Sequence, residues 1–241
     1  MTTHIPNTLT SLNLLCGCIA AVMCFDNQLE VAAYFIFASA IFDLFDGMAA
    51  RRFPPTKHSF GKELDSLADV ISFGFVPGAI MHKLFLLSMP ADYFRSEIVM
   101  TVLQFFPFMI TVFAALRLAR FNVDTQQTNS FLGLPTPAMG LFVVSLPLVM
   151  KQFPGMFDEV MLNPYFILGL SGLLSLFMVV RIPLFSLKFK SFAFKDNIFQ
   201  YLLIALSLIL FPVFLFAAIP VLIILYIFLS LIESLTKAKS S

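Results

Sequence analysis

The chain is 241 residues long, 59% of its residues are hydrophobic, only 12% are charged, and its formal net charge is +1. Soluble domains are about half apolar and about a quarter charged, so this composition excludes a water-soluble globular protein. The small net charge provides no broad basic field for a nucleic acid, and we expect no nucleic-acid partner.

Apolar segments recur along the whole chain, and several reach the roughly 18 to 20 residues that cross a lipid bilayer. The last segment is too long for one crossing and contains Pro212 and Pro220, so we interpret it as a tight hairpin of two helices. The sequence therefore predicts an all-α polytopic membrane protein, with a single transmembrane domain over residues 1–241. We expect a bundle of about eight transmembrane helices, made of a six-helix core and a C-terminal hairpin at 198–236. The apolar segments lie at about 8–25, 29–50, 64–88, 98–120, 131–150, 162–180 and 198–235.

Basic residues are distributed unequally between the two sides of the predicted bundle. If the N-terminus is cytoplasmic, the outer side carries only Lys83, Arg95 and Lys151, and every other Lys and Arg lies on the inner side. Cytoplasmic loops carry an excess of Lys and Arg, so the sequence predicts this orientation in a cytoplasmic (inner) membrane. A hairpin after residue 198 also keeps Lys237 and Lys239 inside.

Four carboxylates lie within the second and third apolar segments. Asp43 and Asp46 are three residues apart, Asp65 and Asp69 are four apart, and each spacing puts the pair on one helix face. A carboxylate at mid-membrane costs about 2.5 to 3.5 kcal/mol, and a divalent cation would remove both this cost and the mutual repulsion. Oxygen ligands favour hard cations, so we expect Asp43, Asp46, Asp65 and Asp69 to bind Mg²⁺ or Mn²⁺.

Two alternatives to a metal site remain open for these acids. They could merely pair with Arg51, Arg52 and Lys62, which lie close in the sequence. Acids inside a membrane also mark ion pathways, so a cation transporter or channel is an alternative of a different class. The clustering of the acids at one membrane face, with no line of polar residues through the later segments, argues against a transporter or channel.

The stretch from Asp43 to Asp69 resembles the signature of the CDP-alcohol phosphatidyltransferase family. It reads D-L-F-D-G-M-A-A-R, nine residues, then G-K-E-L-D-S-L-A-D, and it matches D-x2-D-G-x2-A-R-x8/9-G-x3-D-x3-D at every defined position. The resemblance implies a catalytic core at about 5–185 in which the acids hold metal ions against the diphosphate of a CDP-linked lipid. Asp43, Asp46 and Asp65 would be ligands, and Asp69 would share metal binding with removal of a proton from the acceptor. The acceptor hydroxyl would attack directly and displace CMP.

The same resemblance implies a binding site for the CDP group. Gly47 and Ala50 lack bulk, which would let the nucleotide lie against the second helix. Arg51 could reach a phosphate oxygen, and Gly61 opens the third helix, whose N-terminus favours anions. The predicted CDP-binding residues are Asp46, Gly47, Ala50, Arg51, Gly61, Asn13, Ser59 and Pro135.

Three of these residues have a structural alternative. Asn13 could form a helix-to-helix hydrogen bond instead of contacting cytidine or ribose. Ser59 could cap the third helix, and Pro135 could mark a turn into the fifth.

Further stretches are similar to the phosphatidylserine synthase group of this family. They are I-P-N-T-L-T-S-L-N-L-L-C-G from Ile5 to Gly17, D-S-L-A-D-V-I-S-F-G from Asp65 to Gly74, R-L-A-R-F-N from Arg117 to Asn122, and F-L-G-L-P-T-P from Phe131 to Pro137. The resemblance implies CDP-diacylglycerol and L-serine as substrates, and a homodimer in the lipid bilayer.

The chemistry of the fourth segment is compatible with serine. Arg117 and Arg120 are three residues apart, and two guanidinium groups on one face suit a carboxylate, to which Asn122 could add a hydrogen bond. These arginines could instead mark the cytoplasmic boundary or pair with the acids. Glycerol 3-phosphate or an inositol phosphate is the alternative acceptor, since a phosphate would also attract arginines.

Overall fold

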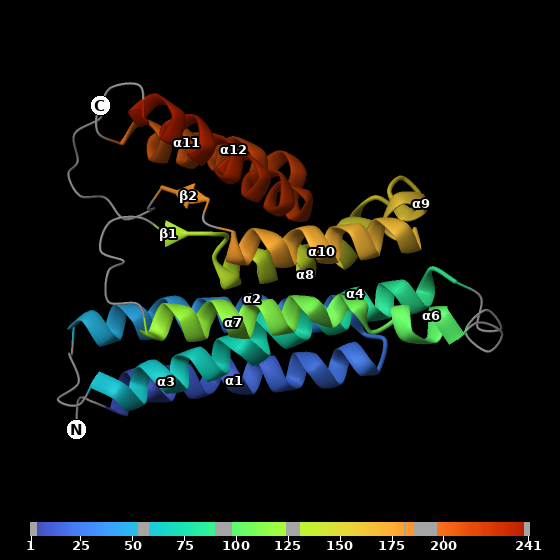
Figure 1. Cartoon of the computed structure of the whole chain (residues 1–241), viewed down its shortest axis with the longest axis horizontal. Coiled ribbons are helices and arrows are strands. Elements are labelled where there is room, and N and C mark those ends of the chain that lie inside the picture. Colours follow the sequence, from blue (N-terminus) through green and yellow to red (C-terminus); the bar gives the residue numbers. More distant parts are fainter. Residues whose placement is uncertain are drawn as a thin grey trace.

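The computed structural model describes residues 4–52, 58–89, 98–123, 131–180, 182–185 and 197–238. They form a layered bundle of helices that run roughly side by side (Figure 1). The elements, in chain order, are α1 (His4–Phe25), α2 (Leu29–Arg52), α3 (His58–Asp69), the π-helix η1 (Val70–Phe75), α4 (Val76–Leu87), α6 (Ile98–Leu103), the 3₁₀ turn η2 (Phe106–Phe108), α7 (Met109–Val123), β1 (Phe131–Leu132), α8 (Thr136–Gln152), α9 (Asp158–Met161), α10 (Pro164–Val179), β2 (Pro183–Leu184), α11 (Ile198–Phe214), the 3₁₀ turn η4 (Leu215–Ala217) and α12 (Ala218–Ala238).

The all-α polytopic membrane fold predicted from the sequence is confirmed. Within the described residues, five helical stretches are long and apolar enough to cross a membrane by length and composition. The last of them, Ile198–Thr236, consists of two helices, because the chain turns at Leu215, whose φ is 45°. These helices, α11 and α12, pack against each other beside the rest of the bundle (Figure 1).

Small residues let the third segment approach its neighbours closely. A Cβ atom on Gly17 of α1 would lie 2.4 Å from Ser72 Oγ and 3.1 Å from Ser72 Cα. A Cβ atom on Gly78 would lie 2.7 Å from Thr111 Oγ1, which places α4 against α7 of the same chain. Helices inside a membrane associate through such close contacts, since burial of apolar side chains gains little when the solvent is lipid.

The third segment is not one regular helix. Directly after Asp69 the chain makes the π-helix η1, in which hydrogen bonds span one residue more than in an α-helix. Ser72 Oγ donates to the carbonyl oxygen of Asn13 at 3.2 Å, and Thr111 Oγ1 donates to that of Gly74 at 3.1 Å. The π-helix is therefore held by α1 on one side and by α7 on the other. Hydropathy predicted the span but not this irregularity.

A two-residue antiparallel pairing links the core to the C-terminal helices. Phe131 of β1 pairs with Leu184 of β2, and Leu132 pairs with Pro183. The pair lies toward the same end of the molecule as the N-terminus (Figure 1). Gly133, which follows β1, has a φ of +80°, and a Cβ atom there would lie 2.6 Å from the carbonyl oxygen of Met178. Glycine is therefore required where β1 turns toward α8.

We predict that Gly17→Ala destabilises the protein by about 1 to 3 kcal/mol, because the added methyl group would overlap Ser72 and force α1 away from η1. Thermal unfolding in detergent would measure the loss as a lower Tm. The matched control is Gly169→Ala in α10, where no atom of a described residue outside the adjoining helix backbone lies within 4 Å of the new methyl group. Equal Tm values for the two variants would contradict the close packing of α1 on η1.

Candidate active site

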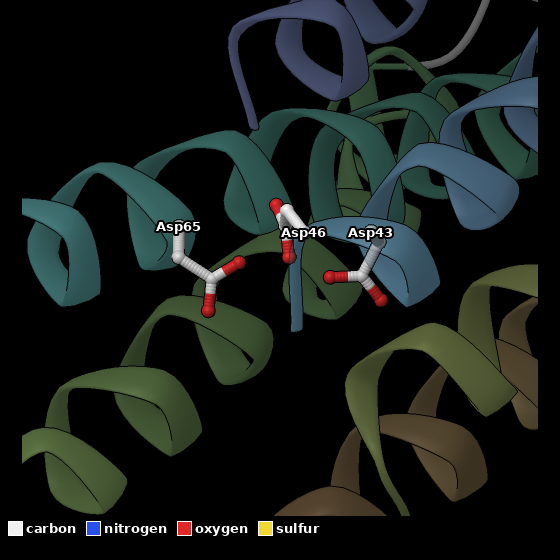
Figure 2. Close-up of side chains that lie close together, drawn as sticks. All are labelled: Asp43, Asp46 and Asp65. Atoms are coloured by element: carbon white, nitrogen blue, oxygen red, sulfur yellow. The ribbon is translucent and has the colours of Figure 1, made fainter. Parts of the chain in front are cut away.

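Three carboxylates from two helices converge on one space. Asp43 and Asp46 lie near the end of α2, Asp65 lies on α3, and one ligand atom of each lies within 4.8 Å of the other two. Figure 2 shows the three side chains extending toward one another from their helices. The spacings in the sequence predicted two acidic faces, and the packing of both α2 and α3 on α1 brings them together.

Asp69 lies beside this cluster, one helical turn beyond Asp65. Its side chain is buried, and it interacts electrostatically with the three clustered carboxylates. Asn13 Nδ2 donates a hydrogen bond to Asp69 Oδ1 at 3.2 Å. The fourth acid of the motif is thus fixed by a neutral amide on a third helix.

A polar face on α1 supports both helices that carry the acids. Thr10 Oγ1 lies at hydrogen-bond distance, 2.7 Å, from Asp46 Oδ2, and Asn13 accepts a short hydrogen bond from Ser39 of α2. Thr10, Asn13 and Ser39 are all buried. Asn13 was predicted from the sequence, whereas Thr10 was missed. Their spacing of three residues, which puts them on one helix face, is the signal that could have identified Thr10.

The donor set fits a hard divalent cation. Asp65 Oδ1 is buried and has no hydrogen-bond partner among the described residues, although a buried carboxylate oxygen ordinarily has one. A cation bound between Asp43, Asp46 and Asp65 would give this oxygen a partner. Mg²⁺ and Mn²⁺ prefer oxygen ligands of this kind.

The alternative of pairing with nearby bases is not supported in the described part of the chain. Arg51 and Arg52 are exposed at the end of α2, and neither forms a salt bridge with an acid there. Lys62 Nζ instead donates to the carbonyl oxygen of Asn122 at 2.8 Å. Arg51, Arg52 and Lys62 therefore leave the acids available for a cation.

The predicted CDP-binding residues lie around the ends of α2 and α3. Above Gly47 the surface is open, since a Cβ atom there would meet only Arg51 Nη1, at 3.7 Å. A Cβ atom on Gly61 would lie 3.2 Å from Asn7 Oδ1 of α1. Pro135 immediately precedes α8 and is half-buried.

Three more residues of the predicted CDP site differ in their surroundings. Asn13 makes the helix-to-helix hydrogen bond that was one of its two interpretations, and it is fully buried. Ala50 is half-buried on α2, next to the exposed Arg51. The side chain of Ser59 lies outside the described residues. Contact of each with CDP stays a prediction.

The three predicted acceptor residues occupy different environments on α7. Arg117 is half-buried, its Nη1 donates to Thr136 Oγ1 at 3.0 Å, and it interacts electrostatically with Asp69. Arg120 is exposed. Asn122 Nδ2 donates to Ser66 Oγ at 2.9 Å and so links α7 to α3. The structure therefore brings Arg117 close to Asp69, whereas Asn122 contacts Ser66 of α3.

The model of the family described as CDP-alcohol phosphatidyltransferase matches residues 3–180. The chain belongs to this family. The matched range contains all four acids, Thr10, Asn13 and Thr136, and it ends before α11 and α12. Membership makes the protein a transferase and gives no support to the transporter or channel alternative.

Similar proteins come from bacteria and archaea. The chain is 34% identical over 208 residues to the CDP-diacylglycerol–serine O-phosphatidyltransferase of Helicobacter pylori strain J99, covering 85% of this chain and 80% of that one. It is 32% identical over 143 residues to the enzyme of the same name from Bacillus subtilis, covering 59% of this chain and 75% of that one. It is 33% identical over 142 residues to the archaetidylserine synthase of Methanothermobacter thermautotrophicus, covering 58% of this chain and 56% of that one.

We predict that Thr10→Val weakens Mn²⁺ binding about tenfold or more, because loss of an outer hydrogen bond lets the Asp46 carboxylate rotate away from its ligand position. Titration of Mn²⁺ followed by electron paramagnetic resonance would measure this without turnover. Thr10→Ser, which keeps the hydroxyl, should restore the affinity.

The control for this variant is Ser11→Ala, which removes an exposed hydroxyl that donates to the carbonyl oxygen of Asn7. Ser11→Ala should bind Mn²⁺ as the unmodified protein does. Unchanged affinity in Thr10→Val would show that Asp46 needs no support from α1.

Proposed function

We propose that the protein transfers the phosphatidyl group of CDP-diacylglycerol to the hydroxyl of L-serine, producing phosphatidylserine and CMP. The convergence of Asp43, Asp46 and Asp65 at one end of the bundle is the observation that carries this proposal. The choice of serine rests on relatives that are named for serine transfer, including the Helicobacter and Bacillus enzymes. The metal would be Mg²⁺ or Mn²⁺.

The acids have separate tasks in this proposal. Asp43, Asp46 and Asp65 hold the cation, with Asp69 as a further ligand, and Thr10 fixes the orientation of Asp46. When bound, the ion neutralises charge on the diphosphate and orients it.

The end of α2 is the proposed place for the nucleotide. Gly47 and Ala50 leave room there, because neither carries a side chain longer than a methyl group. Arg51 lies close to Gly47 and is exposed, so its guanidinium can reach a phosphate oxygen.

Asp69 is the proposed general base. The serine hydroxyl oxygen forms a bond to the phosphorus that carries diacylglycerol, the bond from that phosphorus to CMP breaks, and Asp69 takes the hydroxyl proton. The Asn13 amide donates to Asp69 Oδ1, which fixes the carboxylate and is compatible with its ionised form. No covalent enzyme intermediate is required.

Arg117 is the proposed partner of the serine carboxylate, with Arg120 and Asn122 nearby. The Nε atom of Arg117 is buried and has no hydrogen-bond partner among the described residues, so the guanidinium has a donor to spare. A guanidinium can bind a carboxylate through two parallel hydrogen bonds. Glycerol 3-phosphate and inositol phosphates are the competing acceptors, because their phosphate groups suit the same arginine.

We also propose a cytoplasmic membrane location, with the N-terminus and the acids facing the cytoplasm, and a homodimer. The orientation is supported by the basic residues of the predicted inner side. Labelling of an introduced cysteine in the α1–α2 turn from outside intact cells would test it. Chemical cross-linking in native membranes would test the dimer.

The first test is CMP release by purified protein in detergent with CDP-diacylglycerol, Mn²⁺ or Mg²⁺, and separate acceptors. We expect release with serine, little with glycerol 3-phosphate or inositol phosphate, and none after chelation of the metal. Release only with another acceptor would keep the family chemistry but refute the serine assignment. Release unaffected by chelation would refute the metal site.

A second test addresses the base. Asp69→Asn should lower kcat by at least about 100-fold, since a general base contributes about 10² to 10⁴ in rate. The folded state, measured by Tm, should be kept. Asp26→Asn in the exposed turn between α1 and α2 is the matched control and should retain full activity. Activity of Asp69→Asn within a few-fold of the unmodified enzyme would remove Asp69 from the mechanism.

A further inference from the structure

The C-terminal hairpin, α11 and α12, lies beyond the part of the chain that the family model matches. Its helix α12 nevertheless comes close to Arg117 of the candidate site. A small apolar cluster joins it to the core, separate from the main core of the bundle. Its buried members are Leu184, Phe185, Tyr226 and Leu229.

Tyr226 and Ser230 of α12 hold the residue that follows β2. Tyr226 OH donates to the carbonyl oxygen of Phe185 at 2.9 Å, and the two rings meet edge to face with centroids 5.0 Å apart. The backbone nitrogen of Phe185 donates to Ser230 Oγ at 3.4 Å. Both polar groups of the Phe185 backbone are thus satisfied by one helix, so α12 sets the position of β2.

β2 contacts the segment that leads into α8. β2 pairs with β1, and the backbone nitrogen of Gly133 donates to the carbonyl oxygen of Ile182 at 3.0 Å. Three residues later comes Thr136, which is fully buried and accepts the hydrogen bond from Arg117 Nη1 at 3.0 Å. The segment before this hydroxyl is therefore held by α12, through β2, and by α10, through the hydrogen bond from the backbone nitrogen of Leu134 to the carbonyl oxygen of Phe177.

Arg117 also lies near α12. Its guanidinium is close to both Asp69 and Tyr226. The oxygen of Tyr226 donates its proton to Phe185 and can still accept a hydrogen bond. The unpartnered Nε atom of Arg117 leaves a donor for a further acceptor group. Arg117 is thus near both Asp69 and the hairpin.

We propose that Tyr226 and Thr136 are positioning residues that hold the Arg117 guanidinium for the carboxylate of the acceptor, so that the C-terminal hairpin determines acceptor affinity. The inference rests on the proposed function, in which α2 and α3 bind the CDP-lipid and the cation. The hairpin also packs on α2 through Phe216 of η4, but that ring stacks on Phe37, in the first half of the helix and away from the acids. Acceptor binding should therefore depend on the hairpin, while binding of the lipid donor should not.

The test compares Tyr226→Phe and Thr136→Val with the unmodified enzyme in detergent. Tyr226→Phe keeps the ring in its cluster and removes the hydroxyl, and Thr136→Val keeps the shape and removes the acceptor of the Arg117 hydrogen bond. We expect KM for serine to rise about tenfold in each, equivalent to about 1.4 kcal/mol. KM for CDP-diacylglycerol should stay within about twofold, and Thr136→Ser should restore KM for serine.

Tyr165→Phe, which changes an exposed tyrosine at the start of α10, is the matched control and should leave both constants unchanged. Equal rises in both KM values, or no rise for serine, would overturn the positioning role, as would failure of Thr136→Ser to restore it. Failure of the proposed function would be seen in the unmodified enzyme. If that enzyme releases CMP only with an acceptor other than serine, the serine assignment is wrong, whatever the variants do.

Discussion

The structure depends on keeping four carboxylates together, although among the described bases only Arg117 interacts with one of them, Asp69. Their helices would separate if charge repulsion were the only interaction between them. The polar face of α1 prevents this, because Thr10 contacts Asp46 of α2 and Asn13 joins Asp69 to Ser39. α1 thus serves as a template that presets the positions of these carboxylates, and the proposed cation would complete the arrangement.

Close packing of α1 is the condition for this arrangement. A threonine and an asparagine have short side chains, so they reach the acids only if the backbones approach each other closely. Gly17 allows that approach at η1, and glycine at positions 74 and 78 allows a similar approach of the third segment to α7. The chemistry of the site and the helix packing therefore rest on the same small residues.

Much of this could be predicted from the sequence. The apolar segments indicated the helices because a bilayer requires a minimum span, and the spacings of Asp43, Asp46, Asp65 and Asp69 indicated the two acidic faces. The link from Asn13 to Asp69 could only be stated as one of two alternatives, because a lone polar residue in an apolar helix does not reveal its partner. Thr10 was overlooked although its spacing from Asn13 was visible. Thr136, Tyr226 and the β1–β2 pairing depend on tertiary contacts: Thr136 lies 19 residues after Arg117, on another helix, and two residues per strand have no period to detect.

The π-helix after Asp69 has a consequence for how this chain tolerates insertions and deletions. Its wider turn accommodates one residue more than an α-helix, so removal of a residue between 70 and 75 would let the segment relax into a continuous α-helix. Each residue of an α-helix turns the chain by about 100°, so a deletion that this relaxation absorbs would leave the faces of α3 and α4 in register, whereas an added residue of regular α-helix would rotate them by about that angle. With α4 still seated on α7, such an insertion would turn Asp65 and Asp69 away from α2. The segment should therefore tolerate the loss of a residue better than the gain of one, although hydropathy would hardly register either change.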